Sequence, residues 1–188
     1  MDLVTTKKHK VTARDGTQLN VFVTLPKNYT NQAIPTIIYA SQGRGDASIG
    51  DFDYKTQLWA NRGYAVIQLN FRNASGGFYN FMQGDVSQWA PALYQDVVDV
   101  HKWSIEQGYS EKSKTCLFGE QYAGYIALMA AAKNQSMFKC VAAIGAVSDI
   151  NNHLFNLEGF TSYEQMLSRW SPSSALQHDY SPISFAND

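Results

Sequence analysis

Long apolar runs are missing from this 188-residue sequence, and its first ten residues do not have the pattern of a leader segment. No stretch approaches the ~20 apolar residues of a membrane-spanning helix, and the N-terminus lacks the apolar centre of a signal peptide. We therefore expect a soluble, cytoplasmic protein with no membrane partner. The chain also has no large excess of either charge, since the formal net charge is −1 and acids and bases are mixed along it. Without a basic stripe, no nucleic-acid partner is expected.

Cysteine is rare, with two residues at Cys116 and Cys140, each inside an apolar run. Their spacing fits neither a metal-binding cluster nor a disulfide framework. We therefore predict two buried, reduced thiols that serve packing. No metal site and no cofactor are expected.

The composition is that of an ordinary globular domain, with 45% hydrophobic and 16% charged residues. Aromatic residues are plentiful, which favours a well-filled core over disorder. The length is that of one domain. Residues 1–188 are therefore expected to form a single domain.

The hydrophobic pattern alternates between strands and helices. A hairpin is predicted for residues 8–25 around Asp15-Gly16, because Asp-Gly favours a tight turn. Buried strands are predicted at 36–40, 64–71, 138–145 and up to Gly119, and helices at 51–62, about 90–107 and from the turn after Gly119 to about Lys133. The pattern weakens into short helical pieces after Asp149. A hairpin followed by alternating strands and helices predicts an α/β fold with a mostly parallel sheet.

One stretch carries most of the functional information, residues 114–131. A strand ends at Gly119, a tight turn follows, and a helix of small residues begins at once. This is the frame of a nucleophile elbow, whose pattern is Gly-x-Ser-x-Gly. Here Gln121 stands at the nucleophile position and Ala123 at the second glycine. The frame is present without the nucleophile, and Gln121 is expected at a strained positive φ.

Several short segments, taken in their order along the chain, are more specific than any single motif. They are Asp15-Gly16-Thr17, Ile38-Tyr39-Ala40, Asn61-Arg62-Gly63-Tyr64-Ala65-Val66, Asn70-Phe71-Arg72-Asn73-Ala74-Ser75-Gly76-Gly77, Asp96-Val97-Val98, the elbow Gly119 to Tyr125, Phe138-Lys139-Cys140, Val147-Ser148-Asp149 and Ser181-Pro182-Ile183. Together they resemble the catalytic domain of prolyl oligopeptidase-family serine peptidases, which have an α/β-hydrolase fold. The resemblance implies a single incomplete α/β-hydrolase domain over residues 1–188. The last strands of the fold and the propeller domain would be missing.

The resemblance also implies which groups the chemistry needs. The family uses a Ser nucleophile, a His base and an Asp that orients the His. Gln121 replaces the Ser, and the segments that carry the Asp and His would lie beyond residue 188. The chain is therefore expected to be inactive alone. Two oxyanion-hole donors would remain, the backbone N–H of Tyr122 and the hydroxyl of Tyr39, although both tyrosines could equally be inherited packing residues.

No substitute triad is expected. The histidines are His9, His101, His153 and His178, and none follows a strand in the order that the family requires. His101 is expected at the surface or its boundary. Ser41 follows a buried strand, but no residue nearby is expected to act as its base. Cys116 lies inside a strand and is expected to serve packing. Asp149, at the end of a strand, is the acid best placed for a catalytic role, although the family uses a later one.

Two consequences concern partners. A missing next strand would leave the apolar run Val141–Val147 at a sheet edge, so self-association is expected there. A peptide-like ligand could still use the retained pocket. Two alternatives to an inactive remnant thus stay open: a hydrolase completed by a partner chain, and a peptide-binding pseudo-hydrolase module.

Overall fold

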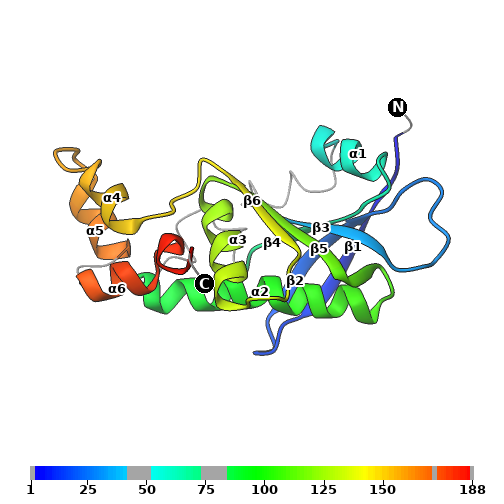
Figure 1. Cartoon of the computed structure of the whole chain (residues 1–188), viewed down its shortest axis with the longest axis horizontal. Coiled ribbons are helices and arrows are strands. Elements are labelled where there is room, and N and C mark those ends of the chain that lie inside the picture. Colours follow the sequence, from blue (N-terminus) through cyan, green and yellow to red (C-terminus); the bar gives the residue numbers. More distant parts are fainter. Residues whose placement is uncertain (1–2, 42–51, 73–83, 171–172, 187–188) are drawn as a thin grey trace.

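The computed structural model describes residues 3–41, 52–72, 84–170 and 173–186. These residues form a six-stranded sheet with helices on both faces, and three short helices gather at one end (Figure 1). The strands are β1 (Thr6–Thr12), β2 (Gln18–Thr24), β3 (Ile34–Ser41), β4 (Ala65–Asn70), β5 (Ser110–Glu120) and β6 (Cys140–Ile144). The helices are α1 (Tyr54–Ala60), α2 (Val86–Glu106), α3 (Gln121–Lys133), α4 (Ile150–Phe155), α5 (Tyr163–Trp170), α6 (Ser174–Asp179) and the 3-10 helix η2 (Pro182–Phe185).

The strand order is β1-β2-β4-β3-β5-β6. The first two strands form the predicted hairpin and β2 pairs antiparallel with β4, whereas β4, β3, β5 and β6 are parallel. Gly16 in the hairpin turn has φ 85°, which explains the glycine there. The predicted mixed α/β architecture is confirmed.

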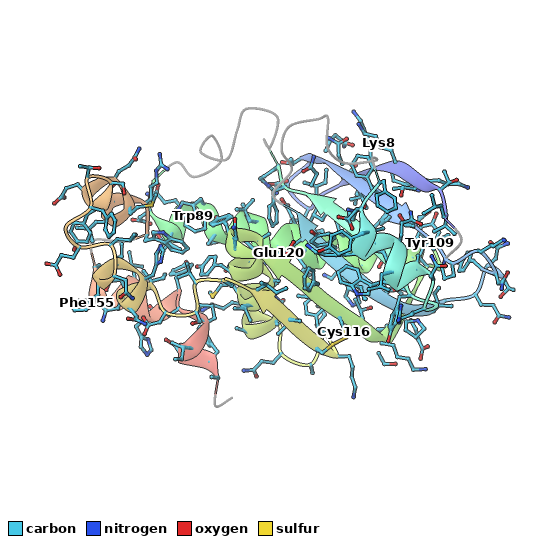
Figure 2. All side chains as sticks on the ribbon, turned by 90° about the horizontal axis from the view of Figure 1, so that it is seen from above. Lys8, Trp89, Tyr109, Cys116, Glu120 and Phe155 are labelled. Carbon is cyan, nitrogen blue, oxygen red and sulfur yellow. A yellow bond between two sulfur atoms is a disulfide. The ribbon has the colours of Figure 1, made fainter. Side chains whose placement is uncertain are left out.

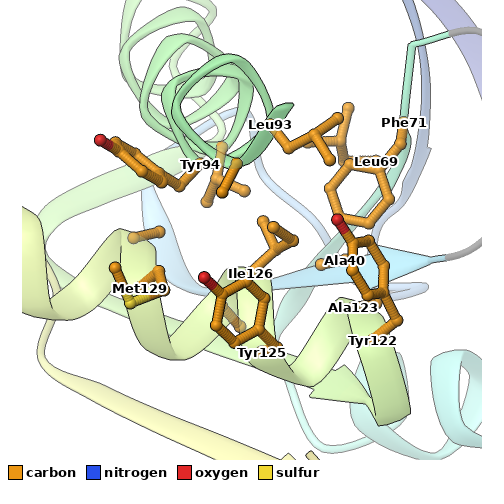
Figure 3. Packing of buried hydrophobic residues seen from close by; sticks show 14 of the residues in the cluster. Ala40, Leu69, Phe71, Leu93, Tyr94, Tyr122, Ala123, Tyr125, Ile126 and Met129 are labelled. Carbon is orange, nitrogen blue, oxygen red and sulfur yellow. The ribbon is translucent and has the colours of Figure 1, made fainter. Parts of the chain in front are cut away.

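The main core lies between the sheet and the pair α2 and α3 (Figure 3). All six residues of β4 are buried, as expected for a strand covered on both faces. A smaller cluster of Tyr39, Ala60 and Val66 lies on the α1 side of the sheet, with Trp59 and Phe118 packed against it. The parallel strands are therefore held from both faces.

The helices differ in detail from their predicted bounds. α2 begins at Val86, four residues before the predicted start, because Asp85 caps it by accepting a hydrogen bond from the Ser87 N–H. α1 is shorter than predicted, and Phe52 lies before it with 68% of its surface exposed. Neither α2 nor any other helix in the described ranges is both long and apolar enough to cross a membrane.

The two cysteines correct the sequence-based prediction. Cys116 and Cys140 form a disulfide, and the side chains are half-buried and exposed, respectively (Figure 2). They face each other in the register of the neighbouring strands β5 and β6, with a Cα–Cα distance of 4.7 Å. The prediction of two buried, reduced thiols is wrong. The two cysteines are 24 residues apart in sequence and become neighbours only through the pairing of β5 with β6.

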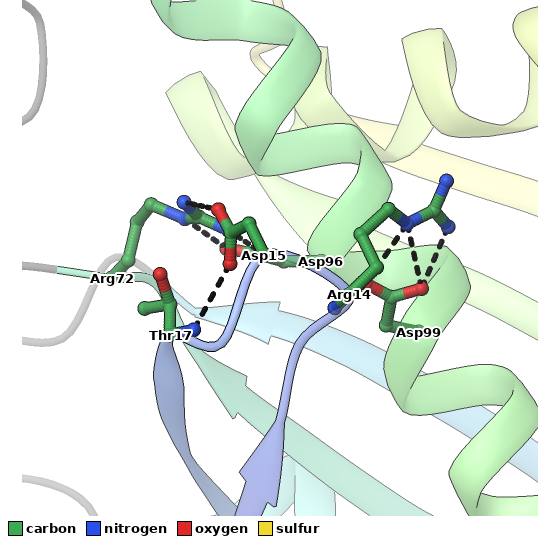
Figure 4. A network of polar contacts seen from close by, with 6 residues as sticks. All are labelled: Arg14, Asp15, Thr17, Arg72, Asp96 and Asp99. Atoms are coloured by element: carbon green, nitrogen blue, oxygen red, sulfur yellow. Dashed lines mark hydrogen bonds and ion pairs between the residues drawn. The ribbon is translucent and has the colours of Figure 1, made fainter.

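A network of ion pairs ties the hairpin turn to the sheet and to α2 (Figure 4). Arg72, just after β4, pairs with Asp96 of α2 and with Asp15 of the turn, the latter at 2.6 Å. The Asp96 side chain is fully buried, and this burial raises its pKa. A second pair joins Arg14 to Asp99 at 2.6 Å, nearer to solvent. Residues singled out by the resemblance thus serve the architecture.

His101 also corrects an expectation, since the residue is 2% exposed rather than at the surface or its boundary. It packs against Phe138, with ring centroids 5.1 Å apart. Burial, assisted by the charge of Lys112, lowers the pKa of His101 to about 4. The imidazole is therefore neutral in the folded protein at neutral pH.

We expect His101→Gln to make the free energy of unfolding depend less on pH in the acidic range. Between pH 6.5 and about 4 the unfolded chain binds a proton at His101 that the folded chain does not, so stability falls as the pH falls. The variant should remove a loss of about 2–3 kcal/mol across this window. Urea unfolding at several pH values measures it. His178→Gln is the matched control, since that side chain is 74% exposed, and an unchanged pH slope in His101→Gln would contradict the prediction.

Candidate functional site

The strand–turn–helix frame is confirmed at residues 119–121. β5 ends at Glu120 and α3 begins at the next residue, Gln121, whose φ is 52°. This left-handed conformation is costly for a side chain other than glycine. The expected positive φ is therefore present, and it belongs to an exposed carboxamide.

The sharpness of the turn depends on two glycines. A Cβ on Gly119 would lie 2.5 Å from the Ala123 carbonyl oxygen, so strand end and helix start approach too closely for a side chain. A Cβ on Gly124 would lie 2.9 Å from the Cβ of Ala146. Ala123 packs in the main core. The close approaches are thus at Gly119 and Gly124.

A polar group stands beside the elbow on the α1 side of the sheet. The hydroxyl of Tyr39 donates a hydrogen bond to Glu120 Oε2 at 3.0 Å, and Lys55 Nζ donates to the same oxygen. Glu120 is the N-cap residue of α3 but its side chain makes no capping hydrogen bond. The carboxylate is instead held by Lys55 and Tyr39, so the Tyr39 hydroxyl is already engaged.

These contacts set the ionisation of the group. The hydrogen bond from Lys55 holds the pKa of Glu120 below its usual value. Burial and the hydrogen bond to Glu120 raise the pKa of Tyr39 to about 12. Burial opposes the charge of Lys55, but the contact with Glu120 raises its pKa overall. At neutral pH the site holds an ammonium, a carboxylate and a neutral phenol.

Tyr122 is turned away from this group. The residue is 6% exposed. Its ring packs against those of Trp89, Tyr125 and Trp170, with centroids 5.3, 6.1 and 6.2 Å apart, and Figure 3 shows the packing of the two tyrosines. Only its backbone N–H, in the first turn of α3, belongs to the elbow. The two oxyanion candidates thus differ in kind: Tyr39 offers a side chain and Tyr122 a backbone donor.

The other candidate residues lie in varied environments. His9 packs against Trp103, His153 packs against Trp170, and His178 contacts Asp179. Asp149 caps α4 by accepting a hydrogen bond from the Asn152 N–H. Ser41 ends β3. The loop 42–46 and the motif residues 73–77 lie outside the described residues.

Within the described ranges, no group of three or more His, Cys, Asp or Glu side chains is placed to hold a metal ion.

The sequence analysis did not single out Glu120 or Lys55. The sequence does show a carboxylate, Glu120, directly before position 121. Its cationic partner, Lys55, belongs to α1 and becomes a neighbour only in the folded chain.

We expect Gln121→Gly to stabilise the protein by up to about 1 kcal/mol. Glycine adopts positive φ without the steric cost that glutamine pays, and the gain is offset in part by the greater freedom of glycine in the unfolded chain. Thermal or urea unfolding measures the difference. Gln165→Gly in α5, also at an exposed glutamine, is the control and should destabilise by about 1 kcal/mol. Equal losses in both variants would contradict strain at Gln121.

Comparison with known proteins shows which protein family and which relatives this chain is similar to. The family model described as X-Pro dipeptidyl-peptidase (S15 family) matches residues 15–185. Dipeptidyl aminopeptidase BIII of Pseudoxanthomonas mexicana is 25% identical in an alignment of 169 residues that covers 85% of this chain and 24% of that protein. Inactive dipeptidyl peptidase 10 of Mus musculus is 34% identical over 56 residues, 30% of this chain and 7% of that protein.

Solved structures share the fold at low sequence identity. Oligopeptidase B from Trypanosoma brucei aligns with a TM-score of 0.77 and 15% identity, covering 96% of this chain and 26% of that one. The acylaminoacyl peptidase of Pyrococcus horikoshii aligns with a TM-score of 0.78 and 14% identity, covering 99% of this chain and 30% of that one. The chain thus spans less than a third of the length of these relatives.

These matches confirm the predicted α/β-hydrolase fold and the kinship with prolyl oligopeptidase-type serine peptidases. The family model covers most of the chain, including the hairpin turn, the elbow and the helices that follow it. The protein therefore belongs to the X-Pro dipeptidyl-peptidase (S15) family of peptidases.

Proposed function

We propose that this chain, by itself, is a non-catalytic member of its peptidase family. The observation that carries the proposal is Gln121 at the apex of the elbow, with φ 52°. A carboxamide is a poor nucleophile and no general base can activate it as it activates a serine. The acyl-serine route to peptide hydrolysis is therefore closed at its first step.

The surroundings support the proposal. The four histidines have other neighbours: His9 and His153 pack against tryptophans, His101 against Phe138, and His178 contacts Asp179. A relative that is 34% identical over 56 residues is itself named inactive. A peptidase fold in this group can therefore persist without the activity.

A fluorophosphonate probe tests the proposal. The purified chain should show no covalent labelling, and it should not cleave a chromogenic dipeptide substrate. Gln121→Ser is the informative variant, since it restores the hydroxyl without adding a base. It should stay far less reactive than an active peptidase of the family. Labelling of the unmodified chain would show that the proposal is wrong.

The first alternative is an active hydrolase that a partner chain completes. The relatives extend well beyond the region that this chain covers, so further groups could come from elsewhere. Gln121 closes the acyl-serine route even then. Hydrolysis of a chromogenic dipeptide substrate by the mixture, when neither chain alone hydrolyses it, would favour this alternative.

The second alternative is a peptide-binding pseudo-hydrolase. It is favoured by the Tyr39 hydroxyl and the Lys55 ammonium beside the elbow, which could bind a peptide carbonyl or carboxylate after displacing Glu120. Peptides that raise the melting temperature of the chain would support it. N-acetylated and amidated peptides identify which terminus is bound.

Self-association through β6 is the proposed partner interaction. Among the described strands β6 pairs only with β5, and Cys140, Ala142 and Ile144 are exposed, the last to 56%. The opposite edge strand, β1, carries three lysines, which protect an edge from pairing, whereas β6 has no charged residue. Two copies could pair β6 with β6 about a two-fold axis.

Sedimentation over a wide range of concentration tests this proposal. The unmodified chain should show a concentration-dependent dimer, and Ala142→Lys should shift it towards monomer because a lysine protects the edge. Thr12→Lys on β1 is the control and should leave the dimer unchanged. A monomer at high concentration would rule the interface out.

A further inference from the structure

The ammonium group of Lys55 sits among aromatic rings. Its Nζ lies 5.8 Å from the ring centroid of Tyr39, 5.5 Å from that of Tyr54 and 5.9 Å from that of Phe118. The same Nζ pairs with Glu120. Three rings and a carboxylate around one cation make a cage, and we use the name aromatic cage for Tyr39, Tyr54, Phe118 and Glu120.

The sheet builds the rigid side of the aromatic cage. Tyr39 and Phe118 are register partners on the parallel strands β3 and β5, and their ring centroids are 5.3 Å apart. The ring of Trp59 in α1 packs against both, with its ring centroid 5.7 Å from that of Tyr39 and 5.0 Å from that of Phe118. Glu120 follows two residues after Phe118 on the same face of β5. The cage walls are therefore preorganised.

The open side is formed by the start of α1. Tyr54 is 63% exposed, whereas Tyr39 is 8% exposed, so the cage has a buried floor and an accessible rim. The Lys55 side chain is 19% exposed and the Glu120 side chain 34% exposed. A ligand can therefore reach the carboxylate from solvent along the path that the lysine stem now takes.

Aromatic faces and a carboxylate both attract a cation, and cages of this kind bind alkylammonium groups. We propose that the aromatic cage is a binding site for an organic ammonium group, such as an amine or the amino terminus of a peptide, and that Lys55 is its internal, displaceable occupant. This goes beyond the proposed function, because ammonium binding does not depend on whether the chain cleaves peptides.

Displacement of Lys55 is feasible for two reasons. The exchange replaces one ammonium by another, so the charge of Glu120 stays neutralised. The released lysine, on the first turn of α1, can extend into water on its flexible stem. The intramolecular lysine competes with the ligand, so the unmodified chain should bind amines weakly and the variant without the lysine should bind them better.

A second lysine offers a matched control. Lys133 lies over the rings of Phe185 and Tyr180, at 4.2 and 5.8 Å from their centroids. Within the described residues it forms no ion pair, so this lysine contacts rings without a paired carboxylate. Comparing the Lys133 site with the Lys55 site therefore distinguishes a cage that contains a carboxylate from an ordinary lysine–ring contact.

The experiment is a titration of Lys55→Ala with tetramethylammonium, followed by NMR shifts of the protein. We expect binding about tenfold tighter than to the unmodified chain, loss of binding in the double variant with Glu120→Gln, and no binding of uncharged tert-butanol. Lys133→Ala should bind no better than the unmodified chain. Circular dichroism checks folding, and Lys55→Gln, which keeps part of the stem, serves as a second variant.

The outcomes are decisive in either direction. Absence of ammonium binding in both folded Lys55 variants would overturn the proposal, and so would equal binding of tert-butanol or equal gains in Lys133→Ala. Binding of a free-amine dipeptide amide, but not of its N-acetylated form, would support a peptide amino terminus as the source. Binding of tetramethylammonium alone would support a small amine. A fluorophosphonate result has no bearing on these readouts.

Discussion

Arg72→Ala is expected to lower the free energy of unfolding by about 3–5 kcal/mol. The substitution leaves the fully buried carboxylate of Asp96 without its cation, and it also releases Asp15 from the hairpin turn (Figure 4). Urea unfolding measures the loss. It should shrink at acidic pH, because burial already raises the pKa of Asp96 and a protonated carboxyl no longer needs a cation.

Arg14→Ala is the matched control for this prediction. Arg14 also pairs with an aspartate of α2, Asp99, but its own side chain is 47% exposed. After the substitution, Asp99 keeps the hydrogen bond that it accepts from the backbone N–H of residue 14. The expected loss is below about 1 kcal/mol. Equal losses for the two arginines would show that burial of Asp96 does not decide the effect.

Gly119→Ala is expected to destabilise the protein by about 3 kcal/mol. The new Cβ would lie 2.5 Å from the carbonyl oxygen and 2.6 Å from the carbonyl carbon of Ala123. Both atoms belong to the backbone of α3, so relief requires the strand end or the helix to move. Thermal and urea unfolding of the purified variant measure the loss.

Gly124→Ala is the comparison that tests this explanation. Its Cβ would meet the Ala146 side chain at 2.9 Å, so the added Ala146→Gly substitution should recover part of the loss. No side-chain change should rescue Gly119→Ala, because its contacts are with the backbone. Equal tolerance of alanine at both positions would show that the elbow is looser than its geometry indicates.

Much of the fold follows from local signals. Asp15-Gly16 predicts the hairpin, the continuously apolar segment at β4 predicts a strand covered on both faces, and the turn after Gly119 predicts the elbow with its positive φ. Each signal is readable from neighbouring residues because turn chemistry and hydrophobic period are local properties. The same local pattern predicts that Gln121 stands at the apex of this turn, where the Gly-x-Ser-x-Gly pattern has its serine.

Other features depend on residues far apart in the chain. His101 was expected near the surface, yet Phe138 and the packing of α2 bury it. Cys116 and Cys140 form a disulfide only because β5 and β6 are neighbours in register. Periodicity does not report which side chains meet across elements, so these results could not be derived from it.

The sequence by itself determined the α/β-hydrolase frame and the glutamine at the apex of its turn, because both depend on the order and local pattern of residues. Only the tertiary structure decided what surrounds that position. Strand register and the packing of α1 bring Tyr39, Lys55 and Glu120 together. Their interactions act through space over separations of up to 81 residues, a distance at which local sequence pattern carries no information.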